Sequence, residues 1–210
     1  MIVLFNVIFL IALAGPVSWS SASAQTCPQW IAKVVSVQGN VEVKKVGGTE
    51  WKATQFREAL CPGDMIRVMK ESRAALVLVT GAIVRLDQYS TAVFNGVEKE
   101  ASLVEILKGV ANFFSRWPRS LKVYTPFVNG TVEGTEFLVK VEDDRTLISI
   151  FEGKVEASNK AGSLTLTGGQ SAMAEAGKAP VPYIVVRPRD AVQWSLYYPR
   201  VTYNCAGEFK

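Results

Sequence analysis

Short segments that alternate apolar and polar residues fill most of the chain, from Val34 to Met173. Val41–Lys44 reads Val-Glu-Val-Lys, a period of two that is typical of a half-buried β-strand. Turn signals such as Asn95-Gly96 and Gly168-Gly169 separate the segments, because Gly and Asn accept the positive φ of tight turns. The pattern predicts about a dozen short strands. No helical pattern lies between them, which excludes a parallel α/β sheet and indicates an all-β fold.

The pattern changes after Gly177. Residues 179–182 read Ala-Pro-Val-Pro, which is typical of a connector, and an aromatic segment follows. Its residues Trp194, Tyr197 and Tyr198 have the i, i+3, i+4 spacing of one helical face, so we expect a short C-terminal helix that begins at an Asp190 N-cap. This aromatic face either packs back on the sheet or docks onto a following domain or a partner.

The amino terminus has the features of an export signal. An apolar run is followed by small residues, and Ala22-Ser23-Ala24 fits the A-x-A cleavage pattern. The run of about 14 apolar residues is shorter than the roughly 20 that cross a bilayer. We therefore predict a signal peptide at 1–24, a β-domain at 25–178, and a connector with the aromatic segment at 179–210. The processed chain would be periplasmic or otherwise exported, without a transmembrane span.

Composition narrows the chemistry. The chain has no His, which excludes a Ser-His-Asp triad, a His-ligated metal and an imidazole proton shuttle. Its 23 Lys and Arg are scattered among 19 Asp and Glu, and the net charge of +4 does not form the basic stripe of a nucleic-acid binder. No pair of carboxylates stands in an acid/base context, and there is no Gly-rich phosphate loop. We expect a non-enzymatic protein without a metal or a cofactor.

The chain has three cysteines, Cys27, Cys61 and Cys205. An oxidising compartment favours one disulfide. We prefer the pair Cys27–Cys61, which would tie the start of the processed chain to a Pro-Gly turn. A bond between Cys27 and Cys205, or three free thiols, stays open.

An ordered set of motifs resembles the FecR domain, the periplasmic module named for the ferric-citrate regulator. The most specific motif joins Thr125-Pro126 to the run Val-Glu-Gly-Thr-Glu-Phe-Leu-Val at 132–139. The other motifs are Val37-Gln-Gly-Asn-Val41, Leu60-Cys-Pro-Gly-Asp-Met-Ile-Arg67, Glu152-Gly-Lys-Val155 and Leu166-Thr-Gly-Gly-Gln170. The resemblance implies an all-β fold of short stacked strands, like a β-roll or β-solenoid.

The resemblance also implies a role. Some FecR proteins carry a cytoplasmic anti-sigma segment and a membrane helix before this domain, which senses an outer-membrane receptor. Other members are exported and carry tetratricopeptide repeats after it, and residues 187–198 look like the junction in those proteins.

We therefore expect an exported protein–protein interaction module that acts in signalling or as a scaffold in the bacterial cell envelope. Its partner would be an envelope protein, such as a tetratricopeptide-repeat protein or a receptor or regulator. Binding could occur by strand addition at an exposed sheet edge. Further candidate contacts are a basic aromatic loop and the aromatic tail: Arg116, Trp117, Arg119, Trp194, Tyr197 and Tyr198. The alternative is a domain that binds peptidoglycan or a small ligand through Trp51 and Trp117.

Overall fold

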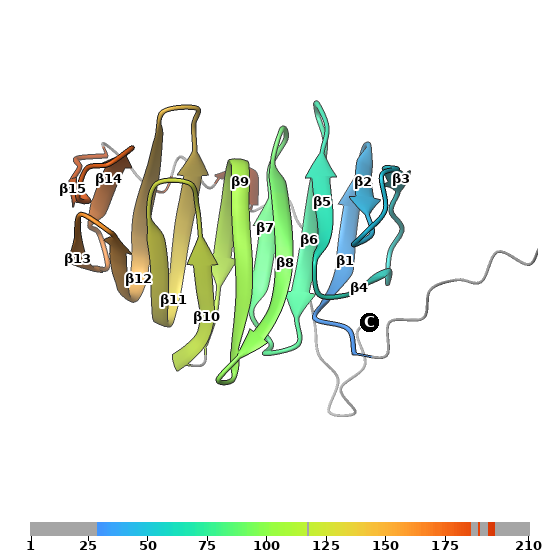
Figure 1. Cartoon of the computed structure of the whole chain (residues 1–210), viewed down its shortest axis with the longest axis horizontal. Helices are drawn as coiled ribbons and strands as arrows, with labels where there is room; N and C mark the ends of the chain where they lie inside the picture. Colours follow the sequence, from blue (N-terminus) through green and yellow to red (C-terminus); the bar gives the residue numbers. More distant parts are fainter. Residues whose placement is uncertain (1–28, 117, 186–188, 190–192, 196–210) are drawn as a thin grey trace, which may run out of the picture.

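The computed structural model describes residues 29–116, 118–185, 189 and 193–195. These residues contain β-strands joined by turns and no α-helix (Figure 1). The strands are β1 (Ala32–Gln38), β2 (Val41–Lys44), β3 (Lys52–Ala53), β4 (Ala59–Leu60), β5 (Asp64–Val68), β6 (Arg73–Leu78), β7 (Ile83–Leu86), β8 (Thr91–Glu98), β9 (Ala101–Phe114), β10 (Pro118–Tyr124), β11 (Asn129–Val141), β12 (Arg145–Asn159), β13 (Gly162–Thr167), β14 (Ser171–Glu175) and β15 (Val181–Pro182).

All fifteen strands belong to one hydrogen-bonded sheet, which folds over into two layers. Layer A contains, in order, β3, β2, β5, β8, the first half of β9, β10, the first half of β11, the second half of β12 and β13. Layer B contains β4, β1, β6, β7, the second halves of β9 and β11, the first half of β12, β14 and β15. Figure 1 shows β8 and β10 in front of the row that contains β6 and β7.

Three long strands pass from one layer to the other. Residues 102–105 of β9 pair with β10, while residues 109–114 pair with β11. In β12, residues 145–149 pair with β14 and residues 154–159 pair with β13. A glycine with positive φ lies at each change of layer: Gly109 (+89°), Gly134 (+55°) and Gly153 (+80°). A side chain would disfavour this backbone conformation, so glycine allows the strand to turn the corner.

The space between the layers is filled by a single apolar core. Side chains alternate on each side of the corner in β12, and the phase shifts by one residue between the two halves, so that Ile148 and Ile150 are buried from layer B and Val155 from layer A. Phe113 and Phe137 stack at the centre, with ring centroids 4.9 Å apart. Because the long strands contribute side chains from both layers, the core holds the layers in a fixed relative position.

The all-β prediction is confirmed, but the β-solenoid is not. Every pairing between the described strands is antiparallel except β9 with β10, whereas the coils of a parallel β-helix pair in parallel. The predicted C-terminal helix lies mostly outside the described residues; Arg189 and residues 193–195 have 3-10 conformation. The predicted signal peptide at 1–24 also lies outside them. No helix in the described part of the chain has the length and hydropathy to cross a membrane.

Candidate interaction site

Four strands end the two layers, and β13 differs from the other three. β3, β4 and β15 have two residues each, and β3 carries Lys52 while β15 contains Pro182. β13 has six residues, Gly-Ser-Leu-Thr-Leu-Thr, with neither a charge nor a proline. Proteins commonly protect sheet edges with short strands, charges or prolines, because a free edge can pair with another chain. We call β13 the open edge.

The hydrogen bonds around β13 show which backbone groups are free. The Thr167 N–H donates to Gln170 Oε1 (2.8 Å), and the Thr167 carbonyl accepts from the Gln170 N–H (3.0 Å). These groups therefore point away from β12, and so do those of Ser163 and Thr165, because backbone direction alternates along a strand. At the other end the Ala161 N–H donates to Asn159 Oδ1 (2.9 Å). No described strand pairs with this side of β13, which leaves Ser163 and Thr165 as the open positions.

A groove lies beside the open edge, between β13 and the segment that follows β15. We call it the edge groove; its volume is about 290 Å³. Leu164 and Leu166 line one wall, and Pro182, Tyr183 and Ile184 line the other. Ile184 is 89% exposed, and Tyr183 is 40% exposed. Adjacent exposed apolar side chains beside a groove are typical of a binding surface.

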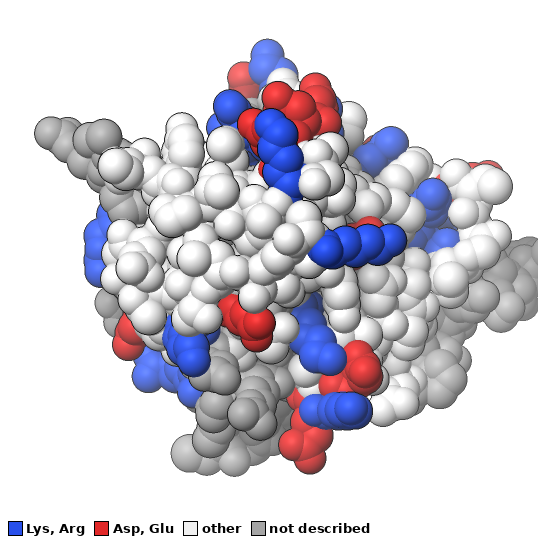
Figure 2. Space-filling view, turned by 60° about the vertical axis from the view of Figure 1, so that its left-hand side comes forward, with Lys and Arg blue, Asp and Glu red and all other residues white. Residues whose placement is uncertain are grey.

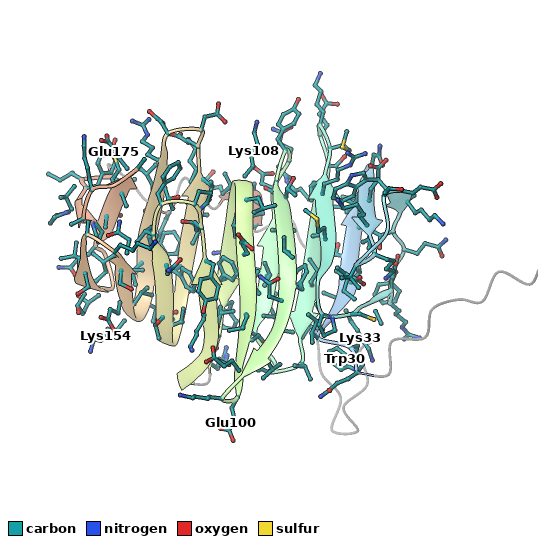
Figure 3. The ribbon with its side chains drawn as sticks, in the orientation of Figure 1. Trp30, Lys33, Glu100, Lys108, Lys154 and Glu175 are labelled. Carbon is teal, nitrogen blue, oxygen red and sulfur yellow. The ribbon has the colours of Figure 1, made fainter. Side chains whose placement is uncertain are left out.

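The surface around the edge groove carries little charge. Residues 161–174 contain no charged side chain, and neither do residues 179–186. Figure 2 shows the end of the molecule that contains these strands: its middle is mostly uncharged, and charged side chains gather toward the top and bottom. In Figure 3, Lys154 and Glu175 lie at the lower and upper margins of this end. The open edge therefore suits an uncharged partner surface.

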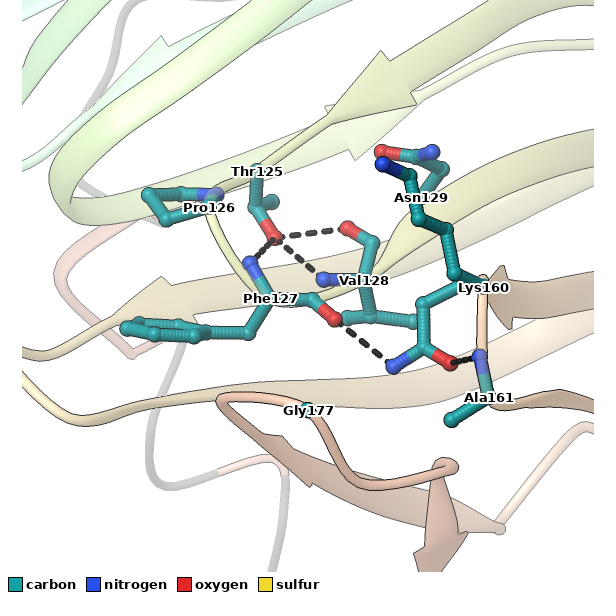
Figure 4. A pocket seen from close by; sticks show the side chains of 9 residues that line it. Thr125, Pro126, Phe127, Val128, Asn129, Lys160, Ala161 and Gly177 are labelled. Atoms are coloured by element: carbon teal, nitrogen blue, oxygen red, sulfur yellow. Dashed lines mark hydrogen bonds between the residues drawn. The ribbon is translucent and has the colours of Figure 1, made fainter.

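A larger pocket of about 560 Å³ lies between three loops (Figure 4). Thr125 Oγ1 donates to the Val128 carbonyl (2.6 Å) and accepts from the Val128 N–H (3.1 Å). Asn159 Nδ2 donates to the carbonyls of Phe127 (2.9 Å) and Lys178 (2.7 Å), so one side chain joins the three loops. These hydrogen bonds are internal, and we assign the Thr125-Pro126 motif a structural role.

Of the contact residues predicted from the sequence, Arg116 and Trp194 have described side chains, and neither lines the edge groove. Arg116 is exposed, with its guanidinium carbon 5.2 Å from the centre of the Phe114 ring. Trp117 lies outside the described residues, and of Arg119 only the backbone, in β10, is described. Trp194 is half-buried beside the buried Ser195, while Tyr197 and Tyr198 lie outside the described residues.

Trp51 is one of the two residues predicted to bind a ligand, and a cation lies over its ring. The Arg67 guanidinium carbon lies 4.3 Å from the centre of the Trp51 ring, and Glu42 holds this guanidinium with contacts of 2.5 and 2.6 Å. The ring is therefore engaged in a cation–π contact instead of offering a bare stacking surface.

Cys61 is disulfide-bonded. Cys27 and Cys205 both lie outside the described residues, so the pair Cys27–Cys61 stays a prediction.

Ion pairs account for the described groups with shifted pKa values. Hydrogen bonds from Lys140 and Arg145 lower the pKa of Glu142, in the turn between β11 and β12. Lys178 lowers the pKa of Glu175 in the same way. Both carboxylates are stabilised in the charged form, which is not the state that a general acid needs at neutral pH. The described residues contain no group of three or more side chains that could hold a metal ion.

The edge groove is not among the predicted features, although the sequence carries a signal for it. The uncharged run at 161–174 is visible in the sequence, but only the strand order shows that β13 ends its layer.

Comparison with known proteins identifies a known domain within the chain. The model of the FecR protein family matches residues 64–156. Two crystal structures, each described as a "putative anti-sigma factor" from Parabacteroides distasonis, share the fold. One has a TM-score of 0.56 at 19% identity, over 68% of this chain and 70% of the other. The second has a TM-score of 0.55 at 20% identity, and the match spans 62% of this chain and 63% of that one. No curated protein matches the sequence. The chain carries a FecR domain at residues 64–156, which confirms the resemblance of its motifs.

Proposed function

We propose that this chain is an exported, non-enzymatic protein–protein interaction module that acts in signalling or as a scaffold in the bacterial cell envelope. The FecR domain supports a regulatory role, and so does the description of each of the two structures with the same fold as a "putative anti-sigma factor". Export would follow cleavage near Ala24, and the partner would be an envelope receptor, regulator or tetratricopeptide-repeat protein.

The observation that carries the proposal is the open edge with its groove. Unpaired N–H and C=O groups of Ser163 and Thr165 supply main-chain hydrogen bonds to an added strand, and the edge groove accepts its apolar side chains. Nothing of this kind surrounds the pocket at Thr125, whose hydrogen bonds tie loops together. Protein binding therefore accounts for the surface better than ligand binding does.

A photo-crosslinking experiment tests the proposal. Benzoylphenylalanine replaces Tyr183, which lines the edge groove, or Tyr89, which is 54% exposed at the turn between β7 and β8 and serves as the matched control. We expect irradiation of the cell envelope to crosslink the Tyr183 variant, and not the Tyr89 variant, to a second envelope protein. Equal patterns, or no crosslink to another protein from Tyr183, would contradict the proposal. Sequencing the amino terminus of the recovered chain tests export: Gln25 is expected first, and an intact precursor in the cytoplasm would refute it.

A further inference from the structure

We infer that the open edge binds a second copy of this chain, so that two β13 strands pair antiparallel about a two-fold axis at Leu164. The inference rests on the proposed function in one respect, since it needs β13 to be a binding edge. It goes further by naming the strand that pairs with β13: each copy supplies that strand for the other, and the envelope partner binds at the edge grooves of the pair.

The free backbone groups have the symmetry that such a pair requires. Bonds to Asn159 and Gln170 occupy the Ala161 N–H at one end of β13 and both backbone groups of Thr167 at the other. The free groups belong to Ser163 and Thr165, which flank Leu164 at equal distance along the strand. With Leu164 on the axis, Ser163 of each copy faces Thr165 of the other, and the two pairs form four hydrogen bonds that use the N–H and C=O groups of both residues.

The side chains fit the same register. Leu166 is buried in the core, and Leu164 points to the same face because side chains alternate along a strand. The two Leu164 side chains would therefore meet across the axis on the groove side. On the outer face the hydroxyls of Ser163 and Thr165 would lie opposite each other, a favourable cross-strand pair.

The charge pattern favours a second copy over a charged partner. Residues 161–174 and 179–186 contain no charged side chain, so two copies can approach here without repulsion or the desolvation of a charge. Pairing would also bring together the exposed side chains of Val181, Tyr183 and Ile184 from both copies at the joint between the molecules. A polar partner would leave these side chains in water.

Sedimentation velocity of the processed chain, over a series of concentrations, tests the inference. We expect a mass twice that of one chain, which falls to that of one chain in Thr165→Pro. Proline removes an N–H that points away from β12, so no hydrogen bond within the chain is lost. Thr165→Lys keeps the N–H but sets like charges beside the axis, and it should also give single chains. Thr165→Val is the matched control and should stay dimeric.

Crosslinking tests the register. A cysteine at Leu164 should form a disulfide between copies on oxidation, because directly opposite residues bring their Cα atoms within the range of about 4.4–6.8 Å that the bond needs. A cysteine at Thr167 should not, since Thr167 lies away from the axis. The inference would be refuted if the processed chain sediments as a monomer at every concentration. It would also be refuted if both Thr165→Pro and Thr165→Lys still sediment as dimers. If the chain sediments as a monomer but the Tyr183 variant still crosslinks to another protein, only the dimer is refuted. If the chain is a dimer and the Tyr183 variant crosslinks only to its own second copy, only the envelope partner is refuted.

Discussion

Replacing Gly153 by alanine tests the corner in β12. The φ of Gly153 is +80°, and an added Cβ would lie 2.2 Å from the Gly134 carbonyl oxygen and 2.6 Å from Thr135 Cγ2. A left-handed backbone costs a non-glycine residue about 1–2 kcal/mol. Overpacking against a backbone that cannot move adds about 1–3 kcal/mol. We therefore expect Gly153→Ala to lower the free energy of unfolding by roughly 2–5 kcal/mol.

Gly169→Ala is the matched control, because Gly169 has a φ of +86° but nothing within 4 Å of an added Cβ. Gly169→Ala has the cost of the left-handed backbone but no steric clash of the added Cβ. Alanine also lowers the entropy of the unfolded chain, which offsets about 0.4–1 kcal/mol of that cost. Urea unfolding followed by circular dichroism measures both variants, and thermal melts should place Gly153→Ala about 10 °C below the parent chain at 2–4 °C per kcal/mol. If Gly153→Ala were no less stable than Gly169→Ala, the close approach at the corner would be refuted.

Three further predictions concern hydrogen bonds and the disulfide. Asn159→Ala should lower the free energy of unfolding, measured in urea, by about 1–3 kcal/mol, because it removes the hydrogen bonds that join three loops. The control is Asn129→Ala, which lies in the same pocket without a described side-chain hydrogen bond and should change the free energy of unfolding little. Equal losses in the two variants would refute the joining role of Asn159. Two cationic neighbours lower the pKa of Glu142, so this carboxylate stabilises the fold above its unfolded pKa of about 4.3 and loses that effect as pH falls through the lower folded value. Glu142→Gln should therefore cost at most about 1 kcal/mol at pH 7 and nothing once the carboxyl is protonated, and a cost that persists in acid would refute the ion pair as its source. Non-reducing peptide mapping should find Cys61 bonded to Cys27; a bond to the third cysteine would contradict this pairing.

Local alternation was enough to predict the strands but not the corners. The sequence pattern predicted short strands, whereas β12 runs for 15 residues, from Arg145 to Asn159, and bends at Gly153. In a sequence, a glycine between two strand-like segments is a turn signal because it accepts positive φ. Hydrogen bonding continues on both sides of this residue, to β14 and to β13, and only the layering of the whole sheet makes that visible.

Gly134 and Gly153 lie together at the corner, and the constraints on the two glycines differ. Gly134 lies within β11 and has a φ of +55°. An added Cβ at Gly134 has its nearest contact 4.0 Å away, so positive φ is the constraint at that position. The tight contact belongs to Gly153, whose Cβ would strike the Gly134 carbonyl. The two glycines form one corner contact, and a linear reading cannot tell which of them needs the space.

The corner at Gly153 connects the FecR domain to the open edge. The first half of β12 pairs with β14 in layer B, and the second half pairs with β13 in layer A. The edge groove lies between β13 and residues Pro182–Val185, on the side of the corner where these two branches part. The family match ends at residue 156, within β12, and β13 to β15 lie beyond it. The matched residues therefore build β5 to β11 and most of β12, whereas the groove walls come from residues outside the match. It follows that the family motifs specify how an edge is presented, and that the uncharged sequence after residue 160 specifies what this particular chain can bind there.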